Sequence, residues 1–171
     1  MTVTSGDTER LTFDEVVASS ERRLLRLALM LSGGAHSAED LVQTVLTRAH
    51  RRWDRIGALD RPDAYLSKMV VNEFLSWRRL RKNQELPLAE LPDAPAGDDV
   101  STRHAQRDAA WRLLADLPRQ QRAVLVLRFY EDLPDDEIAT ILGCSAGTVR
   151  SHASRGLATL RTNLPTSEKD H

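Results

Sequence analysis

The sequence predicts an all-α protein made of two small helical domains, which are joined by an acidic, proline-rich linker and of which the second contains a helix-turn-helix. Three observations predict this architecture. Apolar residues recur at helical spacing along most of the chain. Residues 85–99 interrupt that spacing with three prolines, five acids and no basic residue. Residues 133–160 combine two helical repeats with a glycine between them, as a helix-turn-helix requires.

Composition limits the class of protein. A length of 171 residues suffices for one medium domain or two small ones, and 41% hydrophobic with 29% charged residues is ordinary for a globular protein. The net charge of −1 hides a strong segregation of basic and acidic segments. The single cysteine, Cys144, excludes an internal disulfide and a multi-cysteine metal site. No run resembles a secretory signal or spans a bilayer, which predicts a cytoplasmic protein with no membrane partner.

The first domain is expected at residues 11–84. Its first helix follows a capping box at residues 12–15 and ends at the Ser-Gly-Gly sequence of residues 32–34. Ser37 is the expected cap of the second helix, which runs to about Trp53.

A loop over residues 54–61 leads to Pro62, where the third helix is expected to begin and to continue to about Lys82. One stripe of this helix is polar and increasingly cationic, and consists of Lys68, Asn72, Ser76, Arg79 and Lys82. Trp53 and Tyr65 flank the preceding loop, and aromatic rings beside a cationic helix suit unpaired bases that stack while phosphates are neutralised. Burial of both rings in the core explains them equally well.

The linker is expected to be flexible over residues 85–100, and its negative charge would repel DNA. The second domain then covers residues 101–164. A helix through Trp111 ends before Pro118, where the next helix begins. Because residues 123–127 are apolar on nearly every face, this helix is the expected core of the domain.

The helix-turn-helix prediction depends on four positions. Ala139 is small where two helices must approach closely, Gly143 suits a left-handed turn, Ser145 can cap the following helix, and Val149 can pack back on the first one.

The second helix of this motif has a polar face with no acid between Cys144 and Arg161, whereas the first helix and its approach are rich in acids. That face contains Thr148, Arg150, Ser151, Ser154 and Arg155. The one-sided charge suits phosphates and base edges, which predicts DNA binding. An ordinary helical hairpin with solvated arginines is the alternative.

Together these stretches resemble the extracytoplasmic-function (ECF) branch of bacterial RNA polymerase sigma factors. The matching motifs lie at residues 38–49, at residues 61–72 with the basic tail that follows, and at residues 117–160, in this order. Val42-Gln43-Thr44 and residues 53–56 are similar to the actinobacterial sigma-E-like group.

The resemblance implies two domains that straddle a promoter while attached to core RNA polymerase. It implies a polymerase contact by Asp40, Gln43 and Arg48. Residues 54–61 and the start of the next helix would capture a base flipped from the melted −10 element, and Asn72 would line that pocket. The full set expected at −10 DNA is Trp53, Tyr65, Lys68, Asn72, Ser76 and Arg79. The set expected at the −35 element is Gly147, Thr148, Arg150, Ser151, Ser154 and Arg155. An anti-sigma factor is one expected means of control.

Five positions depart from the family pattern. Ser76 stands where aspartate is common, Thr44 where glutamate is frequent, Pro134 where a capping serine is usual, His152 where arginine is common and Gly156 where alanine is common. A glycine inside a helix costs about 0.5–1 kcal/mol. We therefore expect the −35 contacts to differ from those of other members.

Two rival functions fit parts of the sequence. A response-regulator output domain shares parts of the helix-turn-helix but would need an alternating strand pattern in the first domain, and a helical adaptor would bind neither DNA nor polymerase. An enzyme has little support, since Cys144 lies in a tight turn, and helix capping explains Glu39 and Asp40 beside His36 better than a metal does. The sequence therefore predicts no catalytic residue, no metal site and no cofactor.

Overall fold

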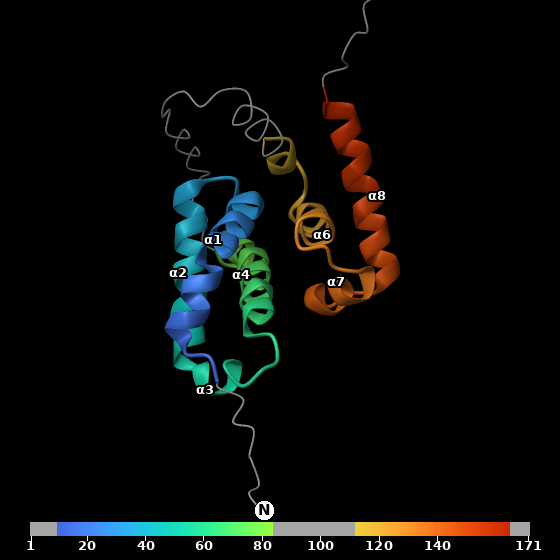
Figure 1. Cartoon of the computed structure of the whole chain (residues 1–171). Coiled ribbons are helices and arrows are strands. Elements are labelled where there is room, and N and C mark those ends of the chain that lie inside the picture. Colours follow the sequence, from blue (N-terminus) through green and yellow to red (C-terminus); the bar gives the residue numbers. More distant parts are fainter. Residues whose placement is uncertain (1–9, 84–111, 165–171) are drawn as a thin grey trace, which may run out of the picture.

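The computed structural model describes residues 10–83 and 112–164, and in those two ranges the chain forms helices joined by short turns (Figure 1). The side chains of residues 78–83 lie outside this description. The predicted linker at 85–100 also falls outside it and stays a prediction. Of the predicted helix through Trp111, only the end is described: residues 112–115 are helical and the helix ends before Pro118, as predicted.

Helix α1 (Phe13–Ser32) begins and ends as predicted. The Thr12 hydroxyl accepts a hydrogen bond from the Glu15 backbone N–H at 3.3 Å, and the Glu15 carboxylate accepts one from the Thr12 backbone N–H at 2.8 Å. These bonds to the charged carboxylate lower the pKa of Glu15. The helix ends at Gly33, whose φ of 78° is the left-handed conformation that glycine adopts without steric cost.

Helix α2 (Ala35–Arg51) starts earlier than the sequence predicted. Its N-cap is Gly34, and Ser37 lies inside the helix, so the prediction of a Ser37 cap is wrong. The reason is local: Gly34 is extended directly after the left-handed Gly33, and its carbonyl already accepts a hydrogen bond from the Ala38 N–H at 2.9 Å. Two adjacent glycines thus end one helix and begin the next without a polar cap.

The segment expected as a loop contains a short helix, α3 (Trp53–Ile56). It forms because Ile56 is buried, with 3% of its surface exposed, and so ties the segment to the core. Helix α4 (Pro62–Asn83) then begins at the proline, as predicted. Helices α1, α2 and α4 pack against one another around a core that includes Leu24, Leu27, Leu31, Leu41, Val45, Leu66, Val70 and Phe74.

The second half is built on α6 (Arg119–Phe129), in which residues 123–127 are all buried, as predicted. Helices α7 (Asp135–Leu142) and α8 (Ala146–Asn163) pack on α6 and on each other. Gly143 has the left-handed φ of 66°, and the Ser145 side chain accepts a hydrogen bond from the Thr148 N–H at 3.1 Å. The predicted helix-turn-helix is therefore present, with Ile138, Val149 and Ala153 buried inside it.

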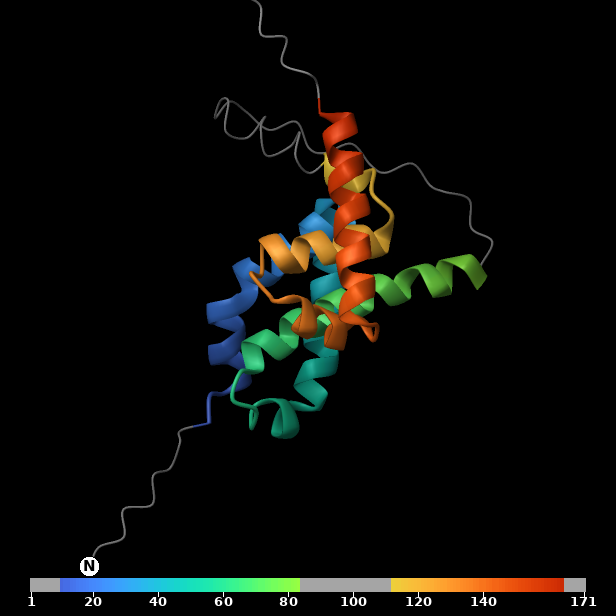
Figure 2. The same ribbon diagram turned by 90° about the vertical axis from the view of Figure 1, so that its right-hand side faces the viewer.

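The two halves of the chain are packed on each other. Helix α6 contacts α1 and α4, and α7 contacts α4, an arrangement visible from the side in Figure 2. The buried apolar side chains of both halves belong to one continuous cluster. No local pattern in the sequence indicates this contact.

Candidate nucleic-acid interface

The first three turns of α8 present a polar surface to solvent. Of the six residues predicted there, Gly147, Thr148, Arg150, Ser154 and Arg155 are exposed and Ser151 is half-buried. Val149 and Ala153, on the opposite side, have at most 1% of their surface exposed. The structure therefore brings the predicted set together on one accessible face of one helix.

The electrostatics of the two helices of the motif differ. Helix α7 has three acids in its first turn, where a negative charge is stabilised by the helix dipole, and Asp135 in addition pairs with Arg128. The first turn of α8 has no acid, and Arg150 and Arg155 are exposed. His152 is half-buried, and its Nδ1 atom is enclosed without a hydrogen-bond partner. The charge of the α8 face therefore suits an anion, whereas the charge of α7 does not.

A second polar surface runs along α4. Tyr65, Asn72 and Ser76 are exposed at helical spacing, and Lys68 beside them is half-buried. The Ser76 hydroxyl donates to the Asn72 carbonyl at 2.8 Å, so the short side chain at this position bonds its own helix. Arg79 lies on α4 with its side chain outside the described part. The four described residues form one stripe.

The two aromatic residues of the predicted −10 set have different surroundings. Tyr65 is 37% exposed. Trp53 is half-buried: its ring meets Phe13 edge-on with centroids 5.2 Å apart, and its Nε1–H donates to the Leu11 carbonyl at 3.3 Å. A Cβ at Gly57 would lie 2.8 Å from Trp53 Nε1, so this glycine makes room for the ring. Packing therefore accounts for Trp53, while Tyr65 faces solvent.

The third predicted set lies on the outer face of α2. Asp40, Gln43 and Arg48 are all exposed. Asp40 pairs with His36 at 3.6 Å, an exposed contact one helical turn apart, and no third metal-ligating group joins them among the residues described. Arg48 pairs with Glu73 of α4, whose side chain is 8% exposed. Arg48 thus links α2 to α4 as well as facing outward.

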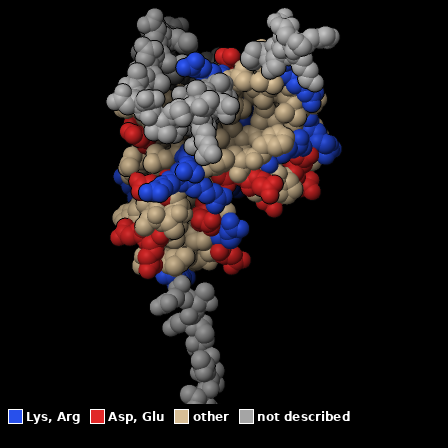
Figure 3. All heavy atoms as spheres, turned by 45° about the horizontal axis from the view of Figure 1, so that its top comes forward, with Lys and Arg blue, Asp and Glu red and all other residues tan. Residues whose placement is uncertain are grey.

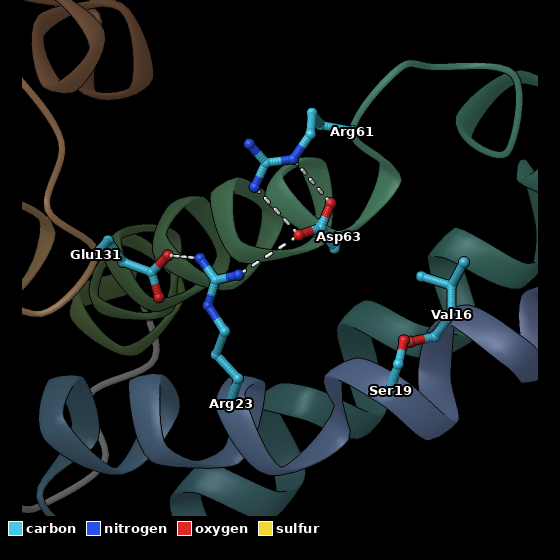
Figure 4. Close-up of polar contacts among 6 residues, drawn as sticks. All are labelled: Val16, Ser19, Arg23, Arg61, Asp63 and Glu131. Carbon is cyan, nitrogen blue, oxygen red and sulfur yellow. Dashed lines mark hydrogen bonds and ion pairs between the residues drawn. The ribbon is translucent and has the colours of Figure 1, made fainter.

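A group of charged contacts between the two halves was not predicted. Arg23 of α1 lies between Asp63 of α4, at 3.4 Å, and Glu131, which follows α6 (Figure 4). The Glu131 side chain is 3% exposed. The hydrogen bond to Glu131 raises the pKa of Arg23. Partial burial by itself raises the pKa of Asp63. Hydrogen bonds from Arg61 and from the Ala64 backbone, together with the charges of Arg61 and Arg23, outweigh this effect, so the pKa of Asp63 is lowered.

Two arginines of α6 complete this contact. Arg122, 9% exposed, donates to the carbonyl of Leu31 in α1 at 2.6 Å and to the carbonyls of Ala115 and Leu117. Burial lowers the pKa of Arg122. Arg119 donates to the Phe74 carbonyl of α4 at 2.9 Å and stacks over the Phe74 ring at 4.7 Å. We call these bonds of Arg122 and Arg119, together with the ion pairs of Arg23, the interdomain contact.

Beside this contact lies an apolar groove of about 370 Å³. Its walls come mainly from α6 and α8, with Met30 of α1 at its edge and Phe129 and Leu164 exposed on its rim. Figure 3 shows, on one face, tan areas with few charged atoms bordered by separate blue and red patches. The groove is thus a feature of both halves together.

Each half of the chain matches a known family model. The family model described as "Sigma-70 region 2" matches residues 16–84, and the model described as "Sigma-70, region 4" matches residues 107–160. The RNA polymerase sigma-E factor of Streptomyces avermitilis is 41% identical over 95% of this chain and 90% of its own length. The chain belongs to the sigma-70 family.

Other members of the family are similar over most of their length. The sigma-E factor of Streptomyces coelicolor is 40% identical over 95% of this chain and 91% of its own length. The ECF sigma factor SigM of Mycobacterium tuberculosis is 31% identical over 89% of this chain and 76% of its own. The solved structure of the sigma factor RpoE of Bartonella quintana, in complex with the anti-sigma factor NepR, matches with a TM-score of 0.66 and 25% identity over 88% of this chain and 94% of that one.

The chain is thus an ECF sigma factor of the sigma-E-like group, as its motifs indicated, and it directs core RNA polymerase to promoters. The α4 stripe falls in region 2 and the α8 face in region 4. Family membership over both halves decides against the response-regulator and adaptor alternatives. No helix of the described part of this sigma factor is long and apolar enough to cross a membrane.

The residues of the interdomain contact could not be found from local patterns. Arg23 and Glu131 are 108 positions apart, and Arg23 and Asp63 are 40 apart. The one available signal was Arg122, a charge directly before five consecutive buried apolar residues in a core helix. A buried cation at such a position must find acceptors elsewhere in the fold.

Proposed function

We propose that this sigma factor reads the −35 element with the exposed face of α8 and the −10 element with the stripe on α4. The observation that carries the first assignment is the exposed, acid-free surface from Gly147 to Arg155, which begins at a helix N-terminus and contains two accessible arginines. Backbone N–H groups and arginines of this kind bind phosphates and base edges in a major groove.

At the −10 element, Tyr65, Lys68, Asn72 and Ser76 would contact the melted strand, with Arg79 at the end of the same stripe. Tyr65 is the better candidate for base stacking, because its ring is exposed whereas the Trp53 ring is packed on Phe13. We propose that Trp53 supports the loop at residues 57–61 and does not itself stack on a base.

The outer face of α2 is the proposed contact with core polymerase, through Asp40 and Gln43, with Arg48 contributing by its exposed edge. The proposed domain limits are 11–84 for region 2, 85–100 for the linker and 101–164 for region 4. This sigma factor would act in the cytoplasm, where core polymerase and DNA are, and would catalyse no reaction. The complex of the similar Bartonella quintana protein with NepR supports an anti-sigma factor as a partner here as well.

The test is reconstitution. Purified chain is mixed with core polymerase and fragmented genomic DNA, and the 5′ ends of the transcripts are sequenced. Transcripts that appear only with the chain, and that share two upstream sequence blocks, are the expected result. The absence of such transcripts, under conditions where another sigma factor with the same core is active, would overturn the proposal. The promoters recovered then supply the templates for the experiments below.

A further inference from the structure

The loop between α3 and α4, residues 57–61, is fixed at both of its ends. Before it, Ile56 is 3% exposed, and the Gly57 N–H donates to the Trp53 carbonyl at 2.7 Å. After it, Pro62 is buried at the start of α4. Figure 1 shows the loop where α2 and α3 end and α4 begins. Because its ends are held by the core, the loop presents its tip to solvent without having to become ordered first.

The tip of the loop combines an apolar side chain with an unpaired carboxylate. Ala58, Leu59 and Asp60 are all exposed, and 44% of the Leu59 surface is accessible. Asp60 has no ion pair or hydrogen bond from its side chain to any residue that the structure describes. The neighbouring Arg61 instead directs its Nε and Nη2 atoms to the Asp63 carboxylate, each at 3.3 Å (Figure 4). The charge that the tip offers to a ligand is therefore negative.

A negative charge at this place needs a favourable contact if the loop meets DNA. The loop adjoins the proposed base-stacking residue, since the Tyr65 N–H donates to the Arg61 carbonyl at 3.1 Å. A carboxylate repels phosphates, and it can only accept hydrogen bonds. A base turned out of a melted strand exposes the donors of its pairing edge and its flat face, and proteins bind that face with apolar or aromatic side chains. Asp60 and Leu59 together match such a base.

We propose that Asp60 is a specificity-determining residue for the −10 element. Its carboxylate accepts hydrogen bonds from an unpaired base that carries an exocyclic amino group, and Leu59 packs on the face of that base. Cytosine, adenine and guanine carry such a group, at N4, N6 and N2. Thymine has none, and its O2 and O4 atoms are acceptors that repel a carboxylate. The inference rests on the proposed function, because it takes the melted −10 strand as the ligand of this part of region 2.

The test uses holoenzyme, formed from the full chain and core polymerase, and fork DNA whose −10 strand is unpaired. Each of the four bases is placed in turn at each unpaired position of a recovered promoter, and binding is measured. At one position, we expect thymine to bind at least about fivefold more weakly than the recovered base. Asp60→Asn should remove most of that difference, because an amide also offers a donor to the thymine carbonyls.

Asp54→Asn is the matched control, because Asp54 is an exposed acid of α3 just before the loop. It removes the same charge and should leave every base preference unchanged. If Asp60→Asn leaves the base preferences intact at every position, or strengthens binding to all sequences equally, the carboxylate acts only on phosphates and the proposal is overturned. Failure of the unmodified holoenzyme to prefer the recovered −10 sequence over a scrambled one would instead overturn the proposed function.

An abasic site tests both side chains together, because it removes the base and keeps its phosphate. On intact fork DNA, Leu59→Ala should weaken binding for all four bases, since packing on a base face is indifferent to the pairing edge. Leu11→Ala is its control, because Leu11 is 53% exposed and lies outside the loop. With an abasic site at the discriminating position, neither Leu59→Ala nor Asp60→Asn should change binding. An effect of either substitution that is equally large on the abasic fork would contradict the assignment of that side chain to the base.

Discussion

Leu125 of α6 occupies the space into which a side chain at Gly156 of α8 would extend. A Cβ built on Gly156 would lie 2.9 Å from Leu125 Cδ1, well inside the optimal carbon–carbon separation of about 3.5–4.0 Å. Leu125 is 3% exposed and Gly156 is buried where the two helices pack. The departure from the family alanine at this position is thus explained by the close approach of α8 to α6.

Gly156→Ala should therefore destabilise the protein, although alanine favours a helix. Overpacking a core costs about 1–3 kcal/mol, whereas replacing a helical glycine by alanine gains about 0.5–1 kcal/mol, so we expect a net loss of about 1 kcal/mol. Urea denaturation measures this difference. With Leu125→Val, which removes the clashing methyl group, Gly156→Ala should instead be stabilising. A stabilising effect of Gly156→Ala in the unmodified protein would contradict this explanation.

Arg48→Ala should lower the stability of region 2 because it leaves the buried Glu73 carboxylate without its partner. Loss of a partner for a buried polar group costs about 1–3 kcal/mol. Gln43→Ala, on the same exposed face of α2, should change stability by no more than about 0.5 kcal/mol. Denaturant titration of both variants gives the comparison.

Glu73→Gln provides the internal control for Arg48. If the cost arises from an unpaired carboxylate, the double variant Arg48→Ala with Glu73→Gln should be more stable than Arg48→Ala alone. An equal or lower stability of the double variant would argue instead that Arg48 acts by packing. A polymerase-binding defect in Arg48→Ala can be assigned to the interface only after this correction.

Local signals explain which parts of the fold could be predicted. The capping box at Thr12, the proline that begins α4, and the glycine and serine around the turn of the helix-turn-helix each act within a few residues of their position. The start of α2 was predicted too late in the chain, because the helix begins after Gly34 without a polar side-chain cap. The interdomain contact was missed because Arg23 lies among exposed polar neighbours and finds its partners only after the chain has folded.

The candidate site likewise combines residues that local patterns predict with residues that they do not. Helical spacing alone placed the α8 residues on one exposed face, since the period of a helix fixes which residues share a side. Spacing could not show that the Tyr65 ring is exposed while the Trp53 ring is packed. Their difference depends on Phe13, which is 40 residues away from Trp53 in sequence and touches only one of the two rings.

Asp63→Asn should reduce stability near neutral pH and have little effect in acid. The pKa of Asp63 is lowered in the folded protein, so its charged form is the one that stabilises the fold. That contribution is complete above the unfolded pKa of about 4 and is lost as the pH falls through the lower, folded pKa. Because the side chain is 33% exposed, we expect a difference below about 1 kcal/mol. Denaturation of both proteins at pH 7 and near pH 2–3 should show a gap that closes in acid. A gap independent of pH would exclude the ion pairs as its source.

Arg150→Ala should weaken recognition of the −35 element in a sequence-dependent way. Arg150 is exposed on the acid-free face of α8 and follows Thr148 by two residues. It can reach base edges when the N-terminus of α8 enters the major groove. A bidentate arginine–guanine contact is worth about 1–3 kcal/mol, or roughly 5- to 150-fold in promoter binding. Holoenzyme binding to a recovered promoter and to versions altered at each −35 base pair measures the effect. Arg161→Ala, in the last turn of α8, is the control, because it keeps the charge of the proposed face intact. If Arg150 contacts a base, the variant should lose discrimination at one base pair only. A uniform loss at every sequence, with a shallower salt dependence, would place Arg150 on a phosphate instead.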